Sequence, residues 1–251
     1  MKVTAFLLAL GLVLGSAGCA SDGSFDSGKA LAVGAGVLQA VTLDENSVKQ
    51  TASLTAKEMD SKNKVAPANS PYTQRLARIT AGMDKAVGLN LNFKVYIADE
   101  VNAFAMADGT VRVYSALMDA MPDDQVLAVI GHEIGHVKLK HSYHQMQTQL
   151  LTDTAFSAAI SVGGVVGELT SSQLGQLGRA VITAQFSQHD ELQADEFSVQ
   201  LLKRMGKDPY AMKRAIETLQ AKYGKSGGFL SSHPSNPKRI ENIQKAINRL
   251  G

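Results

Sequence analysis

The sequence predicts an α+β fold that is mostly helical, with a small antiparallel sheet beside a helix that carries metal-binding side chains. Three observations lead to this prediction. Long segments repeat apolar residues at helical spacing, one short segment alternates as a strand does and is followed by a hairpin signal, and one predicted helix holds two histidines four residues apart. With 251 residues the chain is long enough for one folded domain with a sizeable core.

The composition is that of an ordinary globular protein. Hydrophobic residues make up 45% of the chain and charged residues 19%, and the formal net charge is +2. No long basic run and no interleaving of basic and aromatic residues stands out in the sequence. We therefore expect no nucleic-acid partner.

The first residues have the pattern of a bacterial export signal. A single charge at Lys2 precedes an apolar stretch, residues 3–14, that is shorter than the roughly 20 residues of a membrane-spanning helix. Small residues then lead to Cys19, the only cysteine, in a string that resembles a lipobox with Ser16 where leucine is usual. We expect residues 1–18 to be a lipoprotein signal peptide and residues 19–43 a lipid-anchored N-terminus and flexible tether.

Two consequences follow from this interpretation of the N-terminus. Ala20 stands where aspartate would signal retention in the inner membrane, so we expect the lipid on Cys19 to hold the chain in the bacterial outer membrane, facing the periplasm. The alternative is ordinary cleavage after Ala20, which would release a soluble periplasmic protein. In either case a single cysteine rules out an intramolecular disulfide.

Periodicity and turn signals place the elements of the predicted domain, residues 44–251. Strands flank Asp108-Gly109, a hairpin signal in which both turn positions favour positive φ. The acidic pair after Pro122 suits a helix start, and an apolar-periodic helix runs on from there. We expect helices over 44–64, 70–87, 123–141, 171–205 and 209–223, strands over 92–98, 102–107 and 110–115, and a last helix from Asn236.

The decisive motif is His-Glu-Ile-Gly-His at positions 132–136, on the helix after Pro122. Helical positions four apart are offset by only about 40°, so both imidazoles face the same way and can bind one side of a tetrahedral zinc ion. Glu133 lies about 100° round the helix, where it suits a general base better than a ligand. A chance match to this pattern is expected at about the one-percent level.

Zinc in a catalytic site needs a third protein ligand. Cys19 is excluded by its position, and the extended pattern with a third histidine ten residues on fails because Ser142 stands there. His141 would lie about 140° round the helix from His136, so we expect it to face elsewhere. Two acids four apart are more often a solvated helix face, but the need for a ligand favours Glu191, with Asp195 accepting the free N–H of a ligating imidazole.

These residues resemble the HtpX/CAAX-protease type of zinc metallopeptidase. The resemblance covers roughly residues 45–250: the histidine motif, Ser187-x-x-x-Glu191-x-x-x-Asp195, Asn-Ala-Phe-Ala from position 102 leading into residues 110–115, and His233-Pro with Arg239-Ile. It implies a zincin-like metallopeptidase fold with one zinc ion per chain. The residues that it assigns are His132, His136 and Glu191 as zinc ligands, Glu133 as catalytic base and Asp195 as a residue that orients a ligand.

The same resemblance assigns substrate binding to the hairpin. Asn102, Ala103 and Phe104 would hold the substrate backbone as an added strand, although Asn102 also suits a turn residue that caps the hairpin. His233 has three interpretations: a turn residue, a catalytic donor to the developing oxyanion, or a fourth zinc ligand that keeps the enzyme latent.

We therefore expect a zinc-dependent metalloendopeptidase that hydrolyses peptide bonds in periplasmic or envelope proteins, for envelope quality control. Its partners would be polypeptide substrates, the membrane through the lipid on Cys19, and other quality-control proteins of the envelope. One rival is a periplasmic chaperone or assembly factor with a latent or structural zinc site; another is a zinc amidase acting on cell-wall peptides. Glu133 has no duty in a structural site, which counts against the first rival.

Overall fold

The computed structural model describes residues 45–152, 170–183 and 185–250. Nearly all of them belong to one compact unit, residues 44–147 and 166–251, and only residues 148–152 fall in the other unit. The predictions for the signal peptide, Cys19 and the tether lie outside the described residues. None of the described helices is long and apolar enough to span a membrane.

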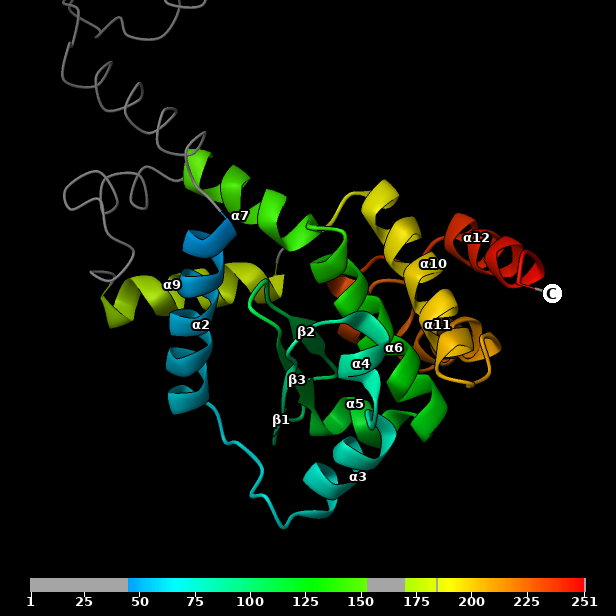
Figure 1. Cartoon of the computed structure of the whole chain (residues 1–251), viewed down its shortest axis with the longest axis horizontal. Coiled ribbons are helices and arrows are strands. Elements are labelled where there is room, and N and C mark those ends of the chain that lie inside the picture. The colour runs from blue at the N-terminus through cyan, green and yellow to red at the C-terminus, as the bar shows by residue number, and fades with distance from the viewer. Residues whose placement is uncertain (1–44, 153–169, 184, 251) are drawn as a thin grey trace, which may run out of the picture. The chain divides into compact units, whose positions relative to one another are not determined.

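The described part of the chain is mostly helical, as the sequence predicts, with a small sheet early in the domain (Figure 1). Its elements in chain order are α2 Glu45–Lys62, α3 Pro71–Ile79, α4 Met83–Val87, β1 Asn92–Tyr96, β2 Ala103–Ala105, β3 Thr110–Tyr114, α5 Ser115–Ala120, α6 Asp123–Lys138, α7 His141–Thr152, α9 Ser171–Thr183, α10 Gln188–Arg204, α11 Tyr210–Tyr223, the 3-10 turn η2 Gly228–Ser231 and α12 Pro237–Asn248.

The sheet has the strand order β1-β3-β2 and is mixed. The expected antiparallel pairing holds for β2 with β3, but β1 pairs with β3 in parallel, which corrects the prediction of an antiparallel sheet. The reason is that β2 lies on the far side of β3 from β1 and runs in the opposite direction. The hairpin turn after β2 then brings β3 between them, in the same direction as β1. One edge of β2 is therefore left without a strand partner in the described sheet.

One face of the sheet packs against α6 and forms the main core. Val95, Val111 and Val113 project toward it, together with Ala103 and Ala105 of β2. On the other side of α6 lies α10, which approaches it closely. Two glycines of α6 permit this approach, because a Cβ at Gly135 would lie 3.1 Å from Ala194 Cα.

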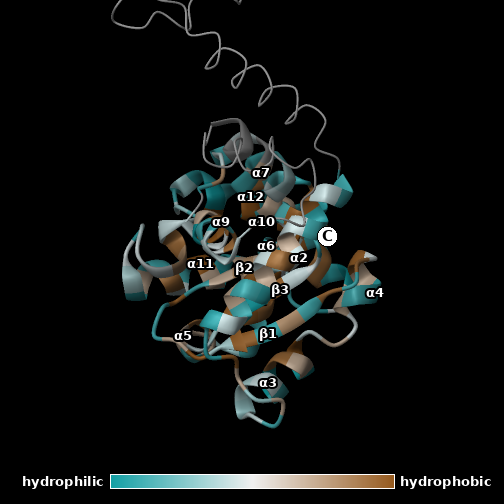
Figure 2. Cartoon of the chain, turned by 90° about the vertical axis from the view of Figure 1, so that its left-hand side faces the viewer, coloured by the Kyte–Doolittle hydropathy of each residue, from teal (hydrophilic) through white to brown (hydrophobic). Residues whose placement is uncertain are grey.

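The opposite face of the sheet is covered by α2 and α9, which contact each other and cross in Figure 1. Figure 2, seen from the α2 side, shows this helix in front of the strands. Tyr96, Phe104 and Tyr114 alternate with the core residues and form an aromatic cluster under α2. On the same face Asp60 of α2 accepts hydrogen bonds from the buried Arg112 at 2.8 and 2.9 Å, which ties the helix to β3.

Several predicted boundaries differ from the structure for local reasons. The helix expected over 70–87 is two helices, because Gly82 adopts φ 81° between α3 and α4. The helix expected over 171–205 is also two, and α10 starts afresh with a capping box formed by Ser187 and Asp190. In the hairpin turn only Gly109 has positive φ, so Asp108 does not adopt the expected conformation.

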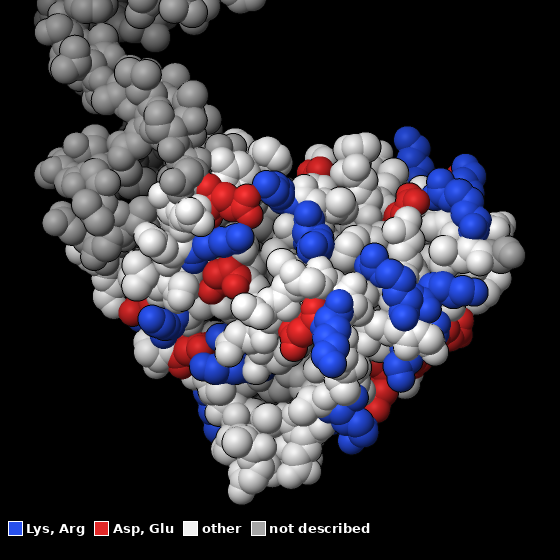
Figure 3. Space-filling model, in the orientation of Figure 1, with Lys and Arg blue, Asp and Glu red and all other residues white. Residues whose placement is uncertain are grey.

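On the face shown in Figure 3, lysine and arginine side chains lie among aspartate and glutamate side chains over much of the surface. Exposed ion pairs among the described residues include Lys140 with Glu45 and Arg214 with Asp208. Such pairs contribute little to stability. The core and the buried polar contacts described below hold the site in place.

Candidate metal centre

The packing of α6 against α10 brings the predicted site residues together. His132 and His136 lie one turn apart on α6, and Glu191 and Asp195 lie one turn apart on the facing side of α10. All four side chains are buried, with exposed fractions of 0–2%. Ser198, one turn further along α10, donates a hydrogen bond to Ala128 O and fixes the register of the two helices.

The donor groups of three side chains, two imidazole nitrogens and one carboxylate, form a triangle of the size that zinc requires. His132 Nε2 lies 3.1 Å from His136 Nε2 and 3.5 Å from Glu191 Oε2, and His136 Nε2 lies 3.4 Å from Glu191 Oε1. Bonds of 2.0–2.1 Å in a tetrahedron place neighbouring donors about 3.3 Å apart. Two imidazoles and a carboxylate in this arrangement fit a zinc ion, and all three side chains are buried.

His233 joins this triangle from the loop between η2 and α12. Its Nδ1 lies 3.2 Å from His132 Nε2 and 2.9 Å from Glu191 Oε1, while its Nε2 lies 3.4 Å from Glu133 Oε1. Donor atoms of His132, His136, Glu191 and His233 all lie within 4.8 Å of one another. His233 is thus close to the metal triangle and to the candidate base, rather than a surface turn residue.

The second nitrogen of His132 is held by a carboxylate. Its Nδ1 lies 2.9 Å from Asp195 Oδ1, as the spacing of the acids predicts. Asp195 in turn receives hydrogen bonds from the buried Arg239 at 2.7 and 2.8 Å, and Arg239 Nη1 lies 2.7 Å from Glu191 Oε2. Arg239 also donates to His233 O at 2.8 Å, so one guanidinium supports three site residues.

Glu133 is buried beside the open edge of β2. Burial raises the pKa of its carboxyl group, although its charged form is favoured by His233, by His132 and by the backbone N–H of Ala105. Glu133 Oε1 has no hydrogen-bond partner. A buried carboxylate with a raised pKa and a free oxygen is suited to accept a proton during catalysis.

The comparison with known proteins decides the family. Residues 70–247 match peptidase family M48, and this segment is well over half of the chain. The chain belongs to peptidase family M48. It is similar to metalloprotease LoiP of Escherichia coli (strain K12), with 41% identity covering 100% of this chain and 99% of that protein. It is also similar to metalloprotease YcaL of the same organism, with 37% identity over 98% of each.

A third relative is longer than this M48 chain. The beta-barrel assembly-enhancing protease of Escherichia coli (strain K12) is 29% identical over 73% of this chain and 40% of its own length. The matching family and the two full-length relatives confirm that the chain is a metallopeptidase with the zincin-like fold that the sequence predicts.

In this M48 chain the predicted substrate-binding residues occupy distinct positions. Asn102 is buried, donates to Glu100 Oε1 at 2.9 Å and accepts from Ala103 N at 2.8 Å, so its side chain shapes the entry to the hairpin. The side chain of Phe104 packs in the aromatic cluster under α2. The backbone N–H and C=O groups of Ala103 and Ala105 point toward the open edge of β2. This follows from the antiparallel register, because the residues next to them in the chain form the backbone hydrogen bonds to β3.

Three residues contact the histidines of the candidate metal centre in a way that the sequence did not predict. His141 Nδ1 lies 3.0 Å from His136 Nδ1, so the expectation that it faces elsewhere was wrong. Phe186 stacks on His136 with ring centres 3.7 Å apart, and Phe229 stacks on His233 at 4.4 Å. Phe186 lies outside regular structure and Phe229 in the short turn η2, and a single aromatic residue at such a place carries no sequence signal for this role.

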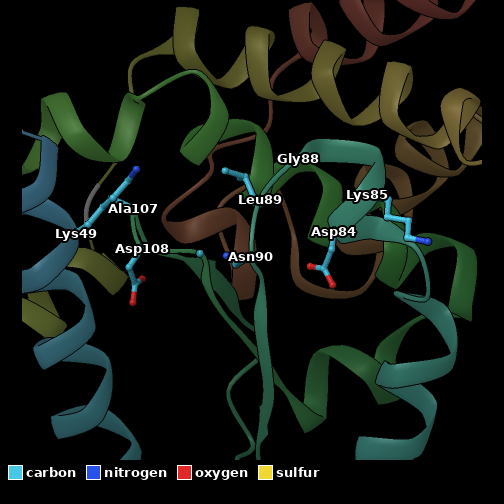
Figure 4. Close-up of a pocket in the computed structure, with 9 residues that line it drawn as sticks. Lys49, Asp84, Lys85, Gly88, Leu89, Asn90, Ala107 and Asp108 are labelled. Carbon is cyan, nitrogen blue, oxygen red and sulfur yellow. The ribbon is translucent and has the colours of Figure 1, made fainter.

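A surface pocket of about 490 Å³ lies beside the turn between β2 and β3 (Figure 4). Lys49 of α2, Leu89 and Asp108 are among its lining residues, and the close-up shows them around the opening. None of its lining residues belongs to the histidine cluster. This pocket is therefore separate from the candidate metal centre.

Proposed function

We propose that this metallopeptidase is a zinc-dependent endopeptidase that cleaves periplasmic or envelope proteins. The observation that carries the proposal is the triangle of His132, His136 and Glu191 donor atoms, whose 3.1–3.5 Å edges suit one zinc ion, with Glu133 beside it. When bound, the zinc ion supplies Lewis acidity, which polarises a carbonyl group and lowers the pKa of water.

Glu133 serves as the general base in this proposal. Its carboxylate takes a proton from the attacking water and passes it to the leaving amine, which allows the peptide bond to break. The raised pKa that burial gives this group suits it to both steps. His233 Nε2, 3.4 Å from Glu133 Oε1, is placed to donate a hydrogen bond near the same reacting atoms.

The substrate backbone is proposed to pair with the open edge of β2. The backbone groups of Ala103 and Ala105 face this edge, and Glu133 contacts Ala105 N–H. A peptide that lies along the edge would be bound mainly through its main chain, which admits many sequences. Asn102 and Phe104 support this strand by shaping the hairpin and anchoring it under α2.

The location in the envelope is part of the same proposal. A signal peptide over residues 1–18 and a lipid on Cys19 would hold the domain of residues 44–251 at the periplasmic face of the outer membrane. One relative is named for enhancing the assembly of beta-barrels, the architecture of outer-membrane proteins, and this name supports an envelope role.

His233 favours a second candidate function. Because its Nδ1 lies 3.2 Å from His132 Nε2 and 2.9 Å from Glu191 Oε1, His233 can complete a closed four-ligand site. A protein in that state would be latent, or would act as a chaperone that holds its clients without cutting them.

The deciding experiment measures casein cleavage and zinc content for the purified mature chain, for Glu133→Gln and for His233→Ala. The proposal expects the parent chain to digest casein and zinc-loaded Glu133→Gln to be inactive. If the parent and His233→Ala are both inactive at full zinc occupancy, the protease proposal is wrong and the chaperone function gains support. Activity that appears only in His233→Ala would indicate a latent enzyme.

A further inference from the structure

The two histidines of the metal motif have different partners at their outer nitrogens. His132 Nδ1 faces the carboxylate of Asp195 at 2.9 Å. His136 Nδ1 faces another imidazole, the Nδ1 of His141, at 3.0 Å. Both inner nitrogens, Nε2 in each case, point into the donor cluster and lie 3.1 Å apart.

The turn between α6 and α7 places His141. Helix α6 ends at Lys138, and Lys140 adopts φ 63°, an uncommon conformation for a residue with a side chain. This reversal brings the first residue of α7 back against the last turn of α6, where His141 is only 7% exposed. A helix that ran on past Lys138 would have pointed this ring away from His136.

Two residues of α10 lie near the other ring nitrogen of His141. His141 Nε2 lies 3.1 Å from Gln193 Oε1 and 3.6 Å from Asp190 Oδ1. Both of these atoms are hydrogen-bond acceptors, and a neutral imidazole carries one proton. They therefore favour the proton of His141 on Nε2, which leaves its Nδ1 as an acceptor.

The direction of these hydrogen bonds decides whether His136 can bind a metal through Nε2. If His141 Nδ1 accepts, His136 carries its proton on Nδ1, and its Nε2 lone pair is free to bind the metal. In the opposite arrangement His141 would donate to His136 Nδ1, and a proton on His136 Nε2 would point into the cluster. That form of His136 cannot ligate through Nε2.

We propose that His141 is a positioning residue that fixes the metal-binding tautomer and the ring orientation of His136, with Gln193 setting the direction of the hydrogen bonds. This role rests on the proposed function, because it takes His136 as a zinc ligand. The site is thereby asymmetric: His132 is supported by an anionic acceptor and His136 by a neutral one. A ligand supported by a carboxylate is the more basic, so His136 is the ligand that depends more on its ring being held in place.

Metal affinity tests the role of His141 without reference to catalysis. The full mature chain is titrated with zinc against a chelating dye, for the parent and for His141→Leu, His141→Asn and His144→Leu. Leucine fills the space without an acceptor, and we expect a loss of about 10–100-fold in affinity. Asparagine supplies an oxygen near the position of Nδ1 and should restore most of that loss. His144 is exposed on the next turn of α7, and its leucine variant is the matched control.

The results divide clearly. Loss in His141→Leu, recovery in His141→Asn and no change in His144→Leu support the proposal. Parental zinc affinity in a folded His141→Leu, or equal losses in the leucine and asparagine variants, would overturn it. A role in packing alone would not distinguish these two replacements by hydrogen-bonding capacity.

Histidine tautomers in the unmodified protein give a second readout that does not depend on any variant folding. Long-range nitrogen–proton NMR spectra of the zinc-loaded chain should show His141 protonated on Nε2 only and His136 protonated on Nδ1. A proton on His141 Nδ1 would overturn the proposal. Neither readout involves casein, so a chain that binds zinc as described but cleaves nothing would contradict the proposed function and leave this inference standing.

Discussion

Arg239 and Asp195 form a fully buried pair, in which two guanidinium nitrogens lie 2.7 and 2.8 Å from the two carboxylate oxygens. Burial by itself would raise the pKa of Asp195, but Arg239 and His132 outweigh it and lower the pKa of this group. Asp195 is therefore an anionic acceptor for His132. The pair links α12 to α10 at the point where α10 faces α6.

Loss of Arg239 should be costly even in the absence of metal. Arg239→Met would leave the charge of Asp195 buried without its partner and would remove support from Glu191 and from the loop of His233. Breaking a buried pair from one side costs about 3–5 kcal/mol. Urea unfolding of the metal-free protein measures this cost.

Arg249→Met is the control for this prediction. Arg249 caps the C-terminal end of α12 and pairs with Glu196, but its side chain is 60% exposed. Replacing it should change the free energy of unfolding by about 1 kcal/mol or less. Equal effects of the two substitutions would contradict a special role for Arg239.

Gly135→Ala should disturb the approach of α10 to the metal motif. The added Cβ would lie 3.1 Å from Ala194 Cα and 3.2 Å from Ala194 O, which are backbone atoms that cannot rotate away. Overpacking of this kind costs about 1–3 kcal/mol, and a shift of α10 would also move Glu191 and weaken zinc binding. Thermal unfolding and zinc titration measure the two effects.

Gly175→Ala is the matched control on another helix. A Cβ there would meet Lys62 Nζ at 3.1 Å, the mobile end of a long side chain. Alanine is also a better helix former than glycine, so this substitution should leave stability unchanged or raise it by up to about 1 kcal/mol. Zinc affinity should stay at the parental level.

The sequence was sufficient to predict the parts of the site that depend on local geometry. The spacing of His132 and His136 places both rings on one face of any helix, and the spacing of Glu191 and Asp195 does the same on the next one. The requirement for a third ligand then selected Glu191, and the structure brings it within 3.4–3.5 Å of the two histidines.

The missed features depend on contacts that no local pattern records. A lysine with positive φ ends the run of α6, so extending the helix to His141 gave the wrong direction for that ring. The position of Arg239 is set by how α12 packs on α10. The alternation of residues 92–98 predicted a strand but could not specify a parallel partner.

Asp60 should make the stability of the fold sensitive to acid. Burial would raise the pKa of its carboxyl group, but hydrogen bonds from Arg112, Lys94 and Tyr96 outweigh this effect and lower it. A carboxyl group whose pKa is lower in the folded state stabilises the protein above its unfolded pKa of about 4. That stabilisation is lost as pH falls below about 4 and through the folded pKa.

Asp60→Asn tests this assignment. The variant should be less stable than the parent at pH 7, because Arg112 keeps its burial and loses its charged partner. The difference between the two proteins should shrink as pH falls from 5 to 3. Urea unfolding across this pH range measures it, and a difference that stays constant with pH would show that Asp60 is not the titrating group.

Removal of the metal should destabilise the chain without unfolding it. Helices α6 and α10 pack through a large apolar core that includes Ile130, Ile134 and Leu201, so the site is held in place by more than its ligands. Zinc at 100 times its dissociation constant would add about 2.7 kcal/mol to the free energy of unfolding. Circular dichroism should therefore report the same helix content with and without a chelator, while the urea midpoint falls on chelation. In Glu191→Gln the midpoint should respond only weakly to zinc, because a charged candidate ligand is gone. Loss of helix on chelation would instead mean that folding itself depends on the metal, as in small zinc domains.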